Sequence, residues 1–232
     1  MVTGTLQMPE PVGGPVSDVF LAPRARGWIH VVAAFLAVLG GAALIGVAWT
    51  GDRPTAAGWA ALVYVAAIIT MFSVSAVYHR MRWTSPVTQK WMMRVDHSVI
   101  FVFIAGTYTP LALLAMPPSV GAEVLVVVWT GAAAGVLFKM AWPSGPRWIG
   151  VSLYLAFGWA AIWFAETLLL GAGLTVVALL IAGAVLYNIG AVCYGMRWPN
   201  PWPTTFGHHE VFHAFTAVAA LCHFAAIWLV IA

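Results

Sequence analysis

The chain has 232 residues, of which 62% are hydrophobic and only 7% charged, and its formal net charge is +3. A soluble domain of this length needs more polar surface than such a composition provides, so the sequence predicts a membrane protein. The two cysteines, Cys193 and Cys222, lie in apolar stretches without the spacing of a thiolate metal site or a disulfide framework. We interpret them as small buried hydrophobic residues.

Seven apolar runs, each about 20 residues long, are long enough to cross the hydrocarbon core of a bilayer. Gly, Pro, Asp and Asn punctuate the short connections, which leave no room for a second domain. The fold class predicted is an all-α membrane protein, with a seven-transmembrane-helix bundle over 28–232 and a short polar tail over 1–27 that lacks the features of a signal peptide. The predicted runs are Trp28–Thr50, Ala56–Tyr78, Asp96–Met116, Gly121–Trp142, Trp148–Leu170, Leu174–Met196 and Phe206–Ala232.

The basic residues are distributed unequally over the two sides of these runs. Nine of the ten lie on one side, and only Arg53 lies on the other. The positive-inside rule therefore predicts a cytoplasmic N-terminus and, after seven crossings, an extracytoplasmic C-terminus. We attribute the positive charge to this topology and to contact with anionic membrane lipids, and we expect no nucleic-acid partner.

The last run opens with two histidines that share one face of a helix. His209 and His213 stand four residues apart, about one turn or 6 Å, so their imidazoles can converge on one metal ion. His208 has Phe212 as its partner four residues on, and His223 lies about 15 Å further along the axis. Neither is expected to join the pair.

The predicted topology brings further polar residues to the level of this pair. The second run ends inside the cell at Ser75 and His79, one turn apart on one face, and the third run begins inside at Asp96. Three imidazoles and a carboxylate are a suitable donor set for zinc. Ser75 can orient a ligand or a water molecule there.

Three separated motifs carry a resemblance to a known family. In combination they resemble the haemolysin III family, which belongs with the progestin and adiponectin receptors. The motifs are S-x-x-x-H at 75–79, Asp96 followed by Ile104–Pro110, and H-x-x-x-H at 209–213 followed by His223-Phe224.

The resemblance implies a seven-helix fold with a cytoplasmic N-terminus and an external C-terminus. It implies that Zn²⁺ is held by His79, His209 and His213, that Asp96 lies near a metal-bound water, and that Ser75 is a neighbour of the site. We also expect a multi-pass protein of a cell membrane, of the bacterial inner-membrane type.

Other interpretations of single residues compete with these. An isolated histidine in a span is more often a packing or hydrogen-bonding residue than a ligand, and we interpret His30, His97 and His223 in this way. The run H-E-V-F-H also fits the H-E-x-x-H pattern of zinc metalloproteases, in which Glu210 would be the general base. The third histidine lies far upstream here, so we expect Glu210 at a helix start, where its charge suits the helix dipole. A transport path is hard to draw, because no run carries a row of ionisable residues.

Three functions remain open at this point. The first is a zinc-dependent, ceramidase-like hydrolase of lipid amides or esters, in which Asp96 accepts the proton of a water and the lipid substrate arrives from the bilayer. The second is a receptor-like or sensor-like membrane protein with a structural zinc. The third is a membrane-permeabilising haemolysin.

Overall fold

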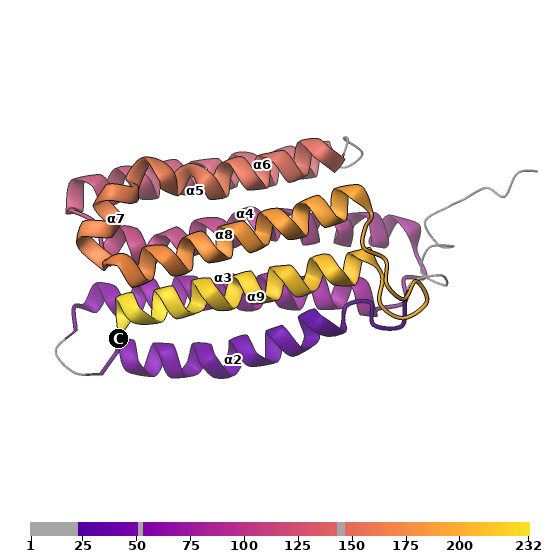
Figure 1. Cartoon of the computed structure of the whole chain (residues 1–232), viewed down its shortest axis with the longest axis horizontal. Helices are drawn as coiled ribbons and strands as arrows, with labels where there is room; N and C mark the ends of the chain where they lie inside the picture. Colours follow the sequence, from indigo (N-terminus) through magenta and orange to yellow (C-terminus); the bar gives the residue numbers. More distant parts are fainter. Residues whose placement is uncertain (1–22, 51–52, 143–146) are drawn as a thin grey trace, which may run out of the picture.

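A computed structural model describes residues 23–50, 53–142 and 147–232, and this part of the chain is all-helical (Figure 1). Seven of its helices are long and apolar enough to span a membrane, which confirms the predicted fold class. The fifth span, Ile149–Ala172, contains a 3₁₀ segment between two α-helices. The elements are α2 (Trp28–Ala48), α3 (Thr55–Arg80), α4 (Pro86–Leu114), α5 (Pro118–Ala141), α6 (Arg147–Trp159), η1 (Ala160–Phe164), α7 (Ala165–Ala172), α8 (Leu174–Met196) and α9 (His208–Ile231).

The start of α4 differs from the sequence-based prediction. The helix begins at Pro86, ten residues before Asp96, because the hydroxyl of Ser85 accepts a bond from the Thr88 amide at 3.4 Å and proline suits the first helical position. These capping residues lie outside the apolar run, so hydropathy alone misses them. Asp96 therefore lies about 15 Å along the helix from its start, and Lys90 and Arg94 belong to α4 instead of to the preceding loop.

Neighbouring helices in the sequence pack side by side from α2 to α5, and α9 packs against α8, α2 and α4 (Figure 1). The approach of α3 to α4 requires a glycine, because a Cβ at Gly106 would lie 2.5 Å from the Cβ of Ala67. The described start of the chain and the start of α9 lie at one end of the bundle, and Ala232 lies at the other.

The bundle is apolar inside and outside. Tyr64, Leu44 and Ile227 are fully buried between helices, whereas Leu170 and Trp163 on the fifth span are 81% and 79% exposed. Large apolar side chains at this exposure indicate a surface that meets lipid. A helix bonds most of its backbone polar groups internally, which suits it to a hydrocarbon environment.

Candidate metal centre

Three histidines from two helices meet at the end of the bundle where α3 ends and α9 begins. His79 comes from the last turn of α3, and His209 and His213 come from the first two turns of α9. Each offers one ring nitrogen, and these nitrogens all lie within 4.8 Å of one another. The structure thus brings together the three predicted ligands, and the group could hold a metal ion.

The orientation of the three rings fits a shared ion. They are inclined to one another by 75° for His79 and His209, 65° for His209 and His213, and 58° for His79 and His213. Because imidazole lone pairs lie in the ring plane, rings inclined in this way can direct nitrogens to a common point. The Nε2 atoms of His79 and His209 are 3.3 Å apart, close to the roughly 3.3 Å expected for two nitrogens bound tetrahedrally to zinc at about 2.0–2.1 Å.

The burial of the three histidines gives a second test of whether they suit a metal ion. His213 is 2% exposed, and its Nδ1 atom has no hydrogen-bond partner among the described residues. A buried polar atom without a partner is costly, so this ring is poorly explained as a packing residue alone. The three neutral imidazoles are also a donor set that zinc accepts.

The two helices that supply these ligands are not close neighbours through their backbones. The helices that pack closely on α9 are α8, α2 and α4, and α3 is not among them. The histidine side chains bridge the remaining space between α3 and α9. The rings of Tyr64 on α3 and Phe224 on α9 also lie 6.2 Å apart, and a bound ion would add a cross-link at the histidine end.

Ser75 and Asp96 form a buried polar link beside the histidines. Ser75 on α3 is 5% exposed and Asp96 on α4 is 8% exposed. The Ser75 hydroxyl lies 2.8 Å from Nδ1 of His30, and it also interacts with the Asp96 side chain. The structure thus connects the two predicted neighbours of the site to each other and to a third residue.

That third residue, His30 on α2, is a feature that the sequence reasoning missed. It is 3% exposed, and its ring stacks on that of His213 with centroids 3.9 Å apart and planes 11° apart. The signal was present in the sequence, because His30 lies near the start of the first predicted span, on the same side as His79 and His209. Treating it as an isolated histidine concealed this placement.

Glu210 lies at the start of α9, as predicted, and both of its carboxylate oxygens are engaged. Its side chain is fully buried, Oε2 accepts a bond from the Gly207 amide at 2.8 Å, and Oε1 forms an ion pair with Arg26. A carboxylate held in this way caps the helix and anchors the chain before α2. The metalloprotease interpretation of Glu210 gains no support from this arrangement.

The segment from Pro23 to Gly27 covers this end of the bundle. The amides of Arg24 and Ala25 donate to the carbonyls of Thr204 and Thr205 at 3.1 and 2.9 Å. Gly27 has a φ of 79°, and a Cβ there would lie 2.8 Å from the Cβ of His79. Only glycine permits this backbone to run so close to the candidate ligand.

The other histidines of α9 lie outside the group. The ring of His208 lies 6.5 Å from that of Tyr194. The ring of His223 reaches the carbonyl of Leu180 on α8 with its Nε2 at 3.1 Å. A Cβ at Gly183 would lie 2.4 Å from Cδ2 of His223, so α8 leaves room for this ring. The prediction that His223 is a hydrogen-bonding residue between helices is confirmed.

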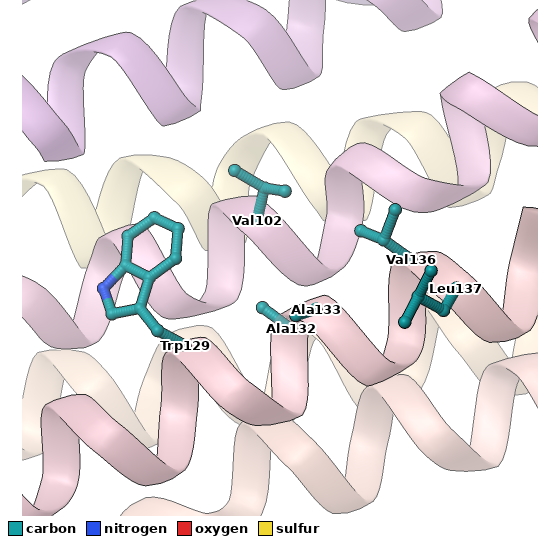
Figure 2. A pocket seen from close by; sticks show the side chains of 6 residues that line it. All are labelled: Val102, Trp129, Ala132, Ala133, Val136 and Leu137. Carbon is teal, nitrogen blue, oxygen red and sulfur yellow. The ribbon is translucent and has the colours of Figure 1, made fainter.

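A groove between α4 and α5 has no comparable chemistry. Its volume is about 380 Å³ and it is lined by Val102, Trp129, Ala132, Ala133, Val136 and Leu137 (Figure 2). The indole N–H of Trp129 donates to the hydroxyl of Thr109 at 3.2 Å and is therefore engaged. The groove offers hydrocarbon contacts only, so the histidine group is the better candidate site.

Comparison with known proteins identifies relatives over most of the chain. A family model described as haemolysin-III related matches residues 20–224. The Hemolysin-3 homolog of Bacillus subtilis is 31% identical over 156 residues, which cover 66% of this chain and 68% of that protein. The human Monocyte to macrophage differentiation factor is 25% identical over 171 residues, covering 72% of this chain and 68% of that protein. A stretch of 48 residues is 52% identical to the ADIPOR-like receptor IZH2 of Saccharomyces cerevisiae, covering 18% of this chain and 15% of that protein.

Proposed function

The chain belongs to the haemolysin III family, within the superfamily of progestin and adiponectin receptors, and from that premise we propose that it is a zinc-dependent hydrolase of lipid amides or esters. The observation that carries the proposal is the convergence of three imidazoles beside a buried serine and aspartate, inside membrane-spanning helices. Structural zinc sites are almost always closed by four protein ligands, whereas catalytic sites use three and leave one position open. Three histidines fit the second kind.

In this proposal His79, His209 and His213 hold the ion. Held by three neutral imidazoles, a zinc ion would supply a positive charge that lowers the pKa of water towards about 7 and polarises a carbonyl group. The three rings supply no negative charge that would weaken this effect. Their fixed inclinations preorganise the donors, which reduces the cost of binding the ion.

Asp96 is the proton acceptor in the proposed reaction. A buried carboxylate is a suitable general base for a water that attacks an acyl carbon. In this proposal the Ser75 hydroxyl, which interacts with Asp96, restrains the orientation of the carboxylate for proton transfer. The proton then passes to the leaving amine or alkoxide, which balances the hydrolysis of an amide or ester.

The surroundings of the site favour a substrate from the bilayer. Pro23–Gly27 and the residues before α9 lie over the histidines at the aqueous end, while the outer surface of the helices is apolar. A ceramide-like or other acyl lipid can bring its amide or ester to the depth of the site while its chains stay in hydrocarbon. Membrane lipids are thus the proposed partners, in a cell membrane with the histidine end on the cytoplasmic side.

The test measures fatty-acid release from a panel of lipid amides and esters by purified protein with known zinc content. We expect turnover by the parent chain, and we expect Asp96→Asn to lose roughly 10²–10⁴-fold in turnover, the usual contribution of a general base. Because Asp96 is not one of the three ligands, its variant should keep most of the zinc. Loss of zinc together with activity, or absence of cleavage by the parent, would argue against the hydrolase.

One observation favours a second candidate, a receptor-like protein with a structural zinc. The histidines bridge α3 and α9, which are not close packing partners, so an ion there would fasten the bundle even without catalysis. The two candidates differ in one result: a structural zinc predicts stability that depends on metal without any lipid turnover. No structural feature of the described residues favours the permeabilising function over these two.

A further inference from the structure

His30 takes part in the site through two separate contacts. Its Nδ1 atom lies 2.8 Å from the hydroxyl of Ser75, and its ring covers one face of His213 at a centroid distance of 3.9 Å. Phe72 meets the same imidazole edge-on at 5.1 Å. Since α2 packs against both α3 and α9, this one side chain joins three helices at the level of the candidate ligands.

The stacking geometry shows that His30 has a different role from the other three histidines. The planes of His30 and His213 are 11° apart, whereas the three candidate ligands are inclined to one another by 58–75°. Because the lone pairs of an imidazole lie in its ring plane, two stacked and nearly parallel rings direct them along separate planes. His30 and His213 are therefore not arranged to share one ion.

The hydrogen bond between His30 and Ser75 restrains the serine side chain. Nδ1 of His30 and Oγ of Ser75 are 2.8 Å apart, and both residues are buried. A hydroxyl rotates to suit its partners, so a fixed imidazole nitrogen at this distance selects one orientation of it. His30 thus fixes the rotation of the Ser75 hydroxyl.

We propose that His30 is a positioning residue of the metal centre, which fixes the ring plane of His213 by stacking and holds the Ser75 hydroxyl by a hydrogen bond. This inference rests on the proposed zinc site. It separates two effects, because stacking acts on the candidate ligand His213 and the hydrogen bond acts on Ser75. Outer residues that orient metal ligands typically contribute about 10–100-fold to metal affinity.

Three variants separate the two contacts. His30→Ala removes both contacts, His30→Phe retains a flat ring over His213 without the hydrogen bond, and His30→Asn retains a donor near Ser75 without the stacked ring. His223→Ala is the matched control, because it removes a histidine in the second half of α9 that bonds to α8. Zinc affinity is measured by competition with a chelator, and the visible spectrum of the cobalt-substituted protein reports ligand geometry.

We expect His30→Ala to weaken zinc binding about 10–100-fold and to change the cobalt spectrum. His30→Phe should restore affinity and spectrum towards those of the parent, while His30→Asn should restore neither. In the His30→Phe background, Ser75→Ala should no longer lower turnover further, because the hydroxyl is already misdirected. His223→Ala should leave affinity and spectrum unchanged.

Parent zinc affinity and spectrum in His30→Ala would overturn the positioning role, as would equal losses in His30→Phe and His30→Ala. Should His30→Ala fail to fold, the contrast between His30→Phe and His30→Asn decides the question. A parent chain that binds no zinc would remove the proposed function and this role together. If the parent binds zinc and the cobalt spectra of both His30→Phe and His30→Ala match that of the parent, the role of His30 alone is contradicted.

Discussion

The two halves of α9 both carry histidines that reach a neighbouring helix, but their ring nitrogens meet different partners. In the second half, His223 directs Nε2 to the carbonyl of Leu180, and Gly183 leaves space for the ring. In the first half, the nitrogens of His209 and His213 face His79 and each other. The difference shows how a packing histidine is distinguished from a candidate ligand: the first has a backbone acceptor, whereas the nitrogens of the second converge on other imidazoles and could hold an ion.

Among the variants considered, removing one candidate ligand should have the largest effect, on both zinc affinity and stability. We expect His213→Ala to lower zinc affinity on the order of 10²–10³-fold, because a zinc binding free energy of about 10–16 kcal/mol is shared among a few ligands. The unfolding temperature of this variant in the presence of zinc should also be lower than that of the parent, since α3 and α9 lose their cross-link. His79→Ala and His209→Ala should behave alike, and unchanged chelator competition in any of the three would contradict the assignment.

Breaking the ion pair between Arg26 and Glu210 should have the next largest effect, which is a loss of stability. Arg26→Gln leaves the buried Glu210 charge without its partner, and we expect a loss near 3 kcal/mol, the low end of the usual range for buried pairs because Arg26 is 23% exposed. Glu210→Gln should cost less, since its amide oxygen can still accept from Gly207.

The same two variants test the metalloprotease interpretation. If Glu210 were the general base, Glu210→Gln would reduce lipid turnover by roughly 10²–10⁴-fold while Arg26→Gln would spare it. We expect the opposite ranking, in which Arg26→Gln loses more than Glu210→Gln. Stability is measured by chemical unfolding, and turnover is measured on the same preparations.

The helix spans were predictable because apolar runs of about twenty residues, and the Gly, Pro, Asp and Asn residues that separate them, are local properties of the sequence. The His209–His213 pair was predictable for the same reason, since a spacing of four residues fixes a shared face. The early start of α4 was not, because Ser85 and Pro86 lie outside the apolar run. The stack of His30 on His213 and the pairing of Arg26 with Glu210 join residues more than 180 positions apart, and no local pattern encodes such contacts.

Removing His223 should have a smaller effect and only on stability. His223→Ala leaves the Leu180 carbonyl without this partner, and a hydrogen bond between membrane helices contributes about 0.6–1.7 kcal/mol. We therefore expect a modest fall in unfolding temperature in detergent with full zinc content. Loss of zinc from this variant would mean that the two halves of α9 are coupled and that His223 also supports the metal centre.

Reporter fusions should leave the structure unchanged and identify which half of α9 faces the cytoplasm. A reporter after Ala232 should read as extracytoplasmic, and one inserted between Arg82 and Ser85 should read as cytoplasmic, as the distribution of basic residues predicts. The insertion site avoids 86–89 because these residues belong to α4. Reporters that read the same side at both positions would contradict the seven-span topology.

The most direct measurement is the zinc content of two matched double variants beside the parent chain. The parent should hold about one zinc per chain; His208→Ala with His223→Ala should retain it, and His209→Ala with His213→Ala should lose it. Both variants remove two imidazoles from the same helix, so a difference between them can come only from which histidines face His79. Full zinc in the His209→Ala, His213→Ala chain, or a parent without zinc, would contradict the metal centre described above.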